Sequence, residues 1–322
     1  MNWWQRVLGR ETRALGRRNA PAVTGSLQSR VALIIHNPIT GGRRLTEVLG
    51  WHDPDDLARQ YQADLYEASG GQVAFDVVER VEVDGWVPKR DGFRYDEATY
   101  LRCWRNQAGF HQPDAADYAQ LIADYDLARK VEDGFIDEVW LFAYPYAGYY
   151  ESTMAGPGAF WCNSPPVLLA PHGRLSRRFV LMGFNYERGV GCMLESFGHR
   201  VESHLQRVWE RWRSDDNLWE RFARYDLVAP GRANCGNMHF APNSVRDYDW
   251  GNPRHVLSNC DDWLNFPDFR GVTRRVNCAE WGNGDMRAHH LWWLRRLPRA
   301  PGETRGILNN WWVYAVDPNA QT

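Results

Sequence analysis

The sequence predicts an α/β protein in which a largely parallel sheet is flanked by helices, with a long loop-rich, Trp-rich C-terminal region packed against it. The first 150 residues alternate between strand-like and helix-like segments, an order typical of parallel sheets. Residues 31–38 and 136–145 are short apolar runs rich in β-branched or aromatic side chains, as expected for strands buried on both faces. Turn-forming Asn, Asp, Gly and Pro dominate residues 227–285, so that region is expected to be ordered but irregular.

The elements between the two apolar runs have recognisable boundaries. Asp53 is suited to cap a helix, Pro54 to occupy its first position, and the glycines at 70–71 to end it. The alternating segment 73–85 predicts the second strand, and 114–130 predicts another helix before the third strand.

A long loop follows the third strand, over residues 144–166. Loops of this length in a compact domain are frequently functional, and the carboxyl end of a parallel strand is the usual location of an α/β active site. Glu151 lies there after a cluster of tyrosines, so it is a candidate catalytic carboxylate, with capping of a turn as the equal alternative. A fourth strand is predicted over residues 177–184.

The segment 185–212 is interpreted as one long helix. At about 100° per residue, Glu195, His199 and Glu202 share one face, and Arg188 lies in the same stripe. The opposite side is apolar, as a core-facing helix requires. The polar stripe is either a functional site or an ordinary solvated face.

Three glycines lie in or beside this helix, at Gly189, Gly191 and Gly198. A glycine in a helix interior costs about 1 kcal/mol relative to alanine, so its presence usually has a packing or functional reason. We therefore expect another part of the chain to approach the helix closely.

The pattern His-x-x-Glu, formed by His199 and Glu202, places an imidazole and a carboxylate one helical turn apart, a spacing that can chelate zinc. A third ligand must come from elsewhere. His239, in the irregular region, is the preferred candidate, and His289 and His290 are its rivals.

Other polar residues complete a hypothetical metal-dependent hydrolase, with zinc or another divalent metal as the cofactor. Glu195 is expected to act as the general base on a metal-bound water or as a partner of a ligand. Arg188 or His289 is expected to stabilise the oxyanion, and Glu151 is a further catalytic candidate. The substrate is expected to be a small molecule, a peptide or a glycan, with a peptide or amide bond as the preferred target.

Composition narrows the class of protein. The chain has 322 residues, 38 basic and 40 acidic side chains and a formal net charge of -2, so nucleic acid is not an expected partner. No apolar run approaches the length of about 18 residues that a membrane span requires, so none is expected. The Gly-rich nucleotide signatures and the serine-hydrolase motif GxSxG are missing, which argues against those activities.

The domain organisation is predicted as an N-terminal arm and linker over residues 1–30, rich in arginine, followed by a single α/β domain over 31–322. Within that domain, residues 31–225 form the sheet-and-helix core and 226–322 the irregular region that completes the site. The N-terminus has no uninterrupted apolar core of a secretory signal, so the protein is expected to be cytoplasmic.

Six cysteines without a CxxC pair are expected to be reduced and mostly buried. The 17 tryptophans exceed ordinary usage several-fold. Most are expected to fill the core, because a surface carrying them all would aggregate.

Two other functions remain open. One is a metal-free glycosidase that uses two of Glu151, Glu187, Glu195 and Glu202 as acid and base, with tryptophans as a sugar platform. The other is a non-catalytic protein that binds a glycan or a protein through a Trp-rich face.

Overall fold

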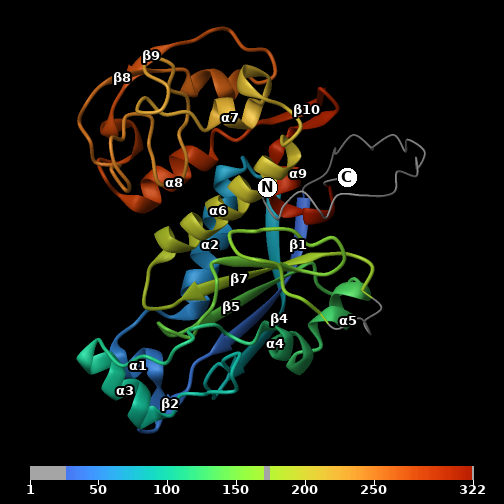
Figure 1. The fold of residues 1–322 in the computed structure, drawn as a ribbon, viewed down its shortest axis with the longest axis vertical. Coiled ribbons are helices and arrows are strands. Elements are labelled where there is room, and N and C mark those ends of the chain that lie inside the picture. The colour runs from blue at the N-terminus through green and yellow to red at the C-terminus, as the bar shows by residue number, and fades with distance from the viewer. Residues whose placement is uncertain (1–26, 170–174, 321–322) are drawn as a thin grey trace, which may run out of the picture.

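The computed structural model describes residues 27–169 and 175–320. Its centre is a five-stranded sheet in the order β4-β1-β5-β7-β6 (Figure 1). The first four of these pair in parallel and β6 runs antiparallel to β7, which confirms the predicted α/β class with a largely parallel sheet. The strands are β1 (Leu27–His36), β4 (Val73–Val83), β5 (Glu138–Ala143), β6 (Ser152–Ala155) and β7 (Phe179–Asn185).

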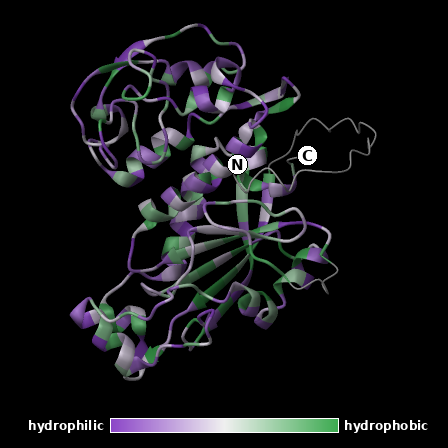
Figure 2. Ribbon diagram, viewed as in Figure 1, coloured by the Kyte–Doolittle hydropathy of each residue, from purple (hydrophilic) through white to green (hydrophobic). Residues whose placement is uncertain are grey.

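The apolar character of the central strands explains their position. All six residues of β5 are buried, as are Val31–Ile35 of β1. Strands with apolar side chains on both faces are stable only where helices cover both faces, which is the arrangement of a parallel sheet. Figure 2 shows hydrophobic residues, in green, along the central strands.

Helices α2 (Pro54–Ala68) and α6 (Val190–Val208) cover one face of the sheet. Tyr61 of α2 packs edge-on against Trp140 of β5, with 5.0 Å between ring centroids, and also contacts Phe197 of α6. As predicted, Asp53 caps α2 through its side chain and Pro54 begins the helix.

Helices α4 (Tyr118–Asp124) and α5 (Leu127–Glu132) cover the opposite face (Figure 1). Tyr125, between the two helices, lies with its hydroxyl 3.1 Å from the His36 Nε2. The sequence predicted one helix over 114–130. The chain instead turns between Tyr125 and Asp126, which has a left-handed φ of 53°.

The C-terminal region folds back over α6 (Figure 1, yellow to red). Helix α6 contacts α7, α8 and α9 as well as α2, β6 and β7, so it lies between the sheet and this region. One continuous cluster of buried apolar side chains runs through both. The region contains α7 (Leu218–Phe222), β8 (Val256–Ser258), β9 (Arg274–Val276), α8 (Met286–Leu294), β10 (Arg299–Thr304), β11 (Ile307–Asn310) and α9 (Trp311–Val316).

The apolar, aromatic-rich sequence of residues 309–317 predicts a strand that joins the sheet or covers its face. This prediction is wrong, because Trp311–Val316 forms α9. The side chain of Asn310 accepts a hydrogen bond from the Trp312 backbone N–H and caps this helix. Every residue of α9 is buried, so the sequence carries no amphipathic period that could distinguish a helix from a strand.

Most tryptophans of the described residues are buried, as predicted, and all the buried ones except Trp140 lie in the C-terminal half. Trp161, in contrast, is exposed, with 61% of its surface accessible to solvent. The buried ones interlock edge-on and stacked with phenylalanine and with one another, as in the group around Phe222. They are Trp140, Trp209, Trp219, Trp250, Trp263, Trp281, Trp292, Trp293, Trp311 and Trp312.

The six cysteines are all free thiols, five of them buried and Cys192 partly so. The remaining small elements are α1 (Leu45–Leu49) with the β2–β3 ribbon (Ile39–Thr40 and Arg43–Arg44), and α3 (Glu97–Asn106). The predicted N-terminal arm falls mainly on residues 1–26, outside the described part of the chain. Within the described part, no helix is long and apolar enough to cross a membrane.

Candidate metal centre

The site forms where the C-terminal region touches α6. Gly198 has no side chain, and a Cβ there would overlap the side chain of Met238. Gly191 lies less closely against Met286 of α8, whose Sδ would be 3.3 Å from a Cβ there. The close approach expected from the helix glycines is therefore present, and it brings His239, the residue after Met238, beside His199.

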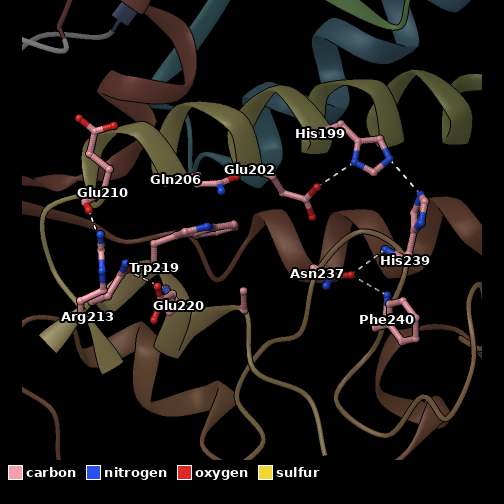
Figure 3. A pocket seen from close by; sticks show the side chains of 12 residues that line it. His199, Glu202, Gln206, Glu210, Arg213, Trp219, Glu220, Asn237, His239 and Phe240 are labelled. Carbon is pink, nitrogen blue, oxygen red and sulfur yellow. Dashed lines mark hydrogen bonds and ion pairs between the residues drawn. The ribbon is translucent and has the colours of Figure 1, made fainter. Parts of the chain in front are cut away.

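The loop that carries His239 is shaped by Asn237. Its side-chain oxygen accepts hydrogen bonds from the backbone N–H groups of His239 and Phe240, at 3.0 and 2.9 Å. Such an Asx turn reverses the chain within a few residues. Figure 3 shows the result: His199 from α6 and His239 from the loop point toward one another.

Three ligand atoms converge at this point. The Nε2 atoms of His199 and His239 are 3.1 Å apart, and Glu195 Oε1 lies 3.4 Å from the His239 Nε2 and 3.9 Å from the His199 Nε2. Ligand atoms about 2.0–2.1 Å from a tetrahedral zinc are roughly 3.3 Å apart. The described residues therefore contain a group, Glu195, His199 and His239, that could hold a metal ion.

A carboxylate binds the far nitrogen of each histidine. Glu202 Oε2 lies 2.8 Å from the His199 Nδ1, and Asp247 Oδ1 lies 3.0 Å from the His239 Nδ1. Carboxylates accept hydrogen bonds, so each Nδ1 is assigned as the protonated nitrogen and each Nε2 as the one with a free lone pair. Two lone pairs facing each other at 3.1 Å repel unless a cation or a proton lies between them.

The charges of the cluster shift its pKa values. Burial would lower the pKa of His199, but the hydrogen bond to Glu202 and the charges of Glu202, Glu151 and Glu195 together outweigh it, and the pKa is raised. The hydrogen bond to Glu195 raises the pKa of His239. Burial would raise the pKa of Glu195, yet the hydrogen bond to His239 and the charge of His290 lower it. The negative charge of the Glu195 carboxylate thus favours a positive charge, either a proton or a cation, between the His199 and His239 rings.

Glu151 is near enough to feel these charges. Its carboxylate accepts a hydrogen bond of 2.6 Å from the Asn163 side chain. Desolvation and the charge of Glu195 raise the pKa of Glu151, while His199 and His239 act in the opposite direction. A carboxyl group with a raised pKa is suited to exchange protons near neutral pH.

Two cavities meet the cluster. The larger, of about 620 Å³, is lined by one stripe of α6 (His199, Glu202 and Gln206), by Glu210 just beyond the helix end and, facing them, by residues within 213–223 and 237–240 (Figure 3). The smaller, of about 220 Å³, lies beyond the ends of β5 and β7 and is lined by Glu151, Arg188 and Glu195, among others.

The remaining predicted residues lie around this centre. Arg188 lines the smaller cavity, with its guanidinium 3.7 Å from the Glu187 carboxylate. His289 and His290 are fully buried beside Trp250, their Nδ1 atoms 3.2 Å apart, and burial lowers the pKa of His290 to about 4. Of the three histidines considered as third ligand, the structure brings His239 to His199 and Glu195.

Sequence reasoning missed Asp247 and Tyr248. The Tyr248 hydroxyl lies 3.1 Å from the His239 Nε2, on the ligand side of the ring. Both residues follow His239 within a turn-rich segment that has no period, so their only sequence signal is proximity to a candidate ligand.

Comparison of the chain with protein-family models, with curated proteins and with solved structures finds no match, so the argument for its function rests on this geometry.

Proposed function

We propose that the protein is a metal-dependent hydrolase, with zinc as the metal, that cleaves peptide or amide bonds. The observation that carries the proposal is the convergence of two Nε2 atoms and one carboxylate oxygen, with a carboxylate on the Nδ1 of each ring. Carboxylate-bound histidine ligands are the usual support of protein zinc sites.

In this proposal Glu195, His199 and His239 hold the cation and leave one position open, as in catalytic zinc sites. A divalent cation there lowers the pKa of a bound water and polarises a carbonyl oxygen. Glu202, predicted as a ligand, instead holds the His199 ring, because its carboxylate lies on Nδ1 and also accepts the Met238 backbone N–H at 2.9 Å.

Glu151 takes the role of general base. Glu195, the base expected from sequence, is assigned to the ligand group, whereas Glu151 lines the smaller cavity together with Glu195 and has a raised pKa, which suits the role. Glu151 accepts the proton of the attacking water and returns it to the leaving nitrogen.

The larger cavity favours an extended polar substrate. From His199 to Gln206 it follows α6 for seven residues, about 10 Å at 1.5 Å per residue, and it continues past the helix end to Glu210. Its walls offer amide and carboxylate groups from Gln206, Asn237 and Glu220, which match a peptide backbone. Trp219, the tryptophan in this wall, is only 7% exposed and is stacked on Phe222, so support for a sugar platform is weak.

Elemental analysis after zinc reconstitution tests the site. We expect near-stoichiometric zinc in the wild type and its loss in His199→Ala and in His239→Ala. His255→Ala, at an exposed histidine outside the cluster, is the matched control and should keep its zinc. Full zinc in His199→Ala would remove the proposed site.

A panel of N-acylated amino acids and short peptides then tests the activity. Zinc-loaded wild type should hydrolyse at least one of them, and Glu151→Gln should keep zinc but lose about 10²–10⁴-fold in kcat. Glycoside cleavage by the metal-free protein, lost when one of the candidate carboxylates is changed, would favour the carbohydrate alternative.

A further inference from the structure

The hydroxyl of Tyr248 points to the place where the three ligand atoms converge. It lies 3.1 Å from the His239 Nε2. Because Asp247 holds the proton of this ring on Nδ1, Nε2 is an acceptor and the phenol is the donor. A cation that takes up the Nε2 lone pair deprives the hydroxyl of that acceptor. The hydroxyl also hydrogen-bonds Glu195, the carboxylate of the same ligand group. When both of these acceptors bind a cation, the hydroxyl proton can be shared with another oxygen bound at the same point.

The backbone of Tyr248 is held in an unfavourable conformation. Its φ of 56° lies in the left-handed region, which residues other than Gly, Asn and Asp rarely adopt. Strain of this kind persists only where the surroundings impose it, and it clusters at functional sites.

Hydrogen bonds around Tyr248 hold its backbone in this left-handed conformation. Its N–H donates to the His239 carbonyl oxygen at 3.1 Å. Asp249 Oδ2 accepts the Val245 N–H and the Asn252 side chain, at 3.0 and 2.7 Å. The Trp250 indole N–H donates to the Met238 carbonyl oxygen at 3.1 Å. These bonds fix the tyrosine to the same loop that carries the ligand.

Packing against the hydrophobic core does not explain the strained backbone of Tyr248. Tyr248 is 51% exposed, and its ring contacts only the His239 and Trp250 rings among the aromatic side chains of the described residues. A side chain that is half in solvent contributes little to the core, so a strained backbone and an inward hydroxyl require another reason.

We propose that Tyr248 is a catalytic residue that donates a hydrogen bond to the substrate oxygen on which negative charge develops. This inference rests on the proposed hydrolase function. When the water oxygen bonds to the carbonyl carbon, one water proton passes to Glu151 and the carbonyl π pair moves to its oxygen. Tyr248 keeps its proton and shares it with that oxygen. As the pair returns, the C–N bond breaks and nitrogen takes the proton from Glu151.

Tyr248 thereby takes the role that the sequence suggested for Arg188. The Arg188 side chain is 64% exposed and is turned toward Glu187, in the smaller cavity. The tyrosine hydroxyl, in contrast, is in direct contact with a ligand atom.

Tyr248→Phe tests the inference, because it removes one oxygen and leaves the ring. Tyr66→Phe is the matched control, at a tyrosine of similar exposure, 54%, on α2. Both variants should bind zinc like the wild type. With the amide that the wild type cleaves, Tyr248→Phe should lose about 10²-fold in kcat with KM changed by less than about threefold, as for an oxyanion donor.

Binding of methylphosphonate, a tetrahedral oxyanion, gives a readout that needs no turnover. Calorimetry should show about tenfold weaker binding to zinc-loaded Tyr248→Phe than to the wild type or Tyr66→Phe. Wild-type kcat and methylphosphonate affinity in Tyr248→Phe would overturn the inference and leave the hydrolase proposal intact. A wild type that binds no zinc would instead refute the hydrolase proposal, and the role of Tyr248 with it.

Discussion

Each histidine of the candidate centre is fixed by a carboxylate that does not face the ligand point. Glu202 holds the His199 ring and Asp247 holds the His239 ring, both through Nδ1. Such partners fix the orientation of the ring and increase the basicity of Nε2, so they affect metal affinity without touching the metal.

Glu202→Gln should therefore weaken zinc binding by about 10–100-fold without abolishing it, because the amide retains the shape of the side chain and loses its charge. Competition with a chromophoric chelator measures this affinity. Glu47→Gln, at an exposed carboxylate on α1, controls for the general loss of one negative charge. An affinity equal to that of the wild type would show that Glu202 does not support His199.

At the residue scale, the sequence identified which residues of α6 form the candidate metal centre better than it identified the role of each one. Helical periodicity placed Glu195, His199 and Glu202 on one face, but it cannot tell which way a carboxylate turns. That choice depends on distant partners: the Met238 N–H binds Glu202, and His239 attracts Glu195. The ligand assignment remains a prediction until metal is measured.

Helix α6 connects the sheet to the C-terminal region through two contrasting contacts. One is the packing of the Met238 side chain directly against Gly198, which has no side chain to prevent it. The other is a fully buried ion pair, in which Arg200 Nη1 lies 2.9 Å from Glu138 Oε2 of β5. A second guanidinium nitrogen of Arg200 donates to the Val316 carbonyl oxygen of α9 at 2.7 Å.

Gly198→Ala should destabilise the protein by about 1–3 kcal/mol, because the new methyl group displaces the buried Met238 and this outweighs the gain in helix propensity. Zinc affinity should fall too, since His239 follows Met238. Urea unfolding with and without zinc measures both effects. Gly191→Ala, where Met286 Sδ is 3.3 Å from the new Cβ, should have a smaller effect. A Gly198→Ala variant as stable as the wild type would contradict the close approach.

Arg200→Met should cost about 3–5 kcal/mol of unfolding free energy, because it leaves the Glu138 carboxylate without its buried counter-charge. Arg207→Met on the same helix breaks an exposed pair with Glu210 and should cost at most about 1 kcal/mol. Denaturant midpoints of the two variants provide the comparison. Equal midpoints would mean that the buried pair contributes no more than the exposed one.

At the scale of elements, the sequence predicted the parallel strands because their apolar runs are strong and local. It missed β6, which lies within the predicted loop 144–166 and pairs antiparallel with β7. Only four residues long and entirely buried, β6 has too little sequence for a recognisable pattern. Its partner lies beyond the next loop, so pairing is a tertiary effect.

Acid should destabilise the whole molecule, in part through buried histidines. Burial lowers the pKa of His36 to about 4 and that of His204 to about 3, with nearby arginine charge adding to both shifts. The unfolded chain binds these protons near pH 6.5 and the folded chain does not. Their stabilising contribution is therefore complete above about pH 6.5 and is lost as the pH falls toward 4 and 3.

Urea midpoints measured between pH 7 and pH 4.5 should consequently decrease. The decrease should be smaller in His36→Gln, which removes one of the two groups, than in His255→Gln, which changes an exposed histidine. A midpoint that stays constant over this range in the wild type would show that these histidines do not couple folding to protons.

The two edges of the sheet determine how the molecule behaves in a crowded solution. Outer strand β4 exposes Asp76 and Arg80. Arg80 pairs with Asp55 at 2.7 Å, so this edge presents fixed charge to any approaching strand. At the other edge, the Val167 N–H donates to the Met154 carbonyl oxygen of β6 and covers part of it. Charge on one edge and a covering segment on the other oppose the addition of a foreign strand, so neither edge is a ready template for aggregation.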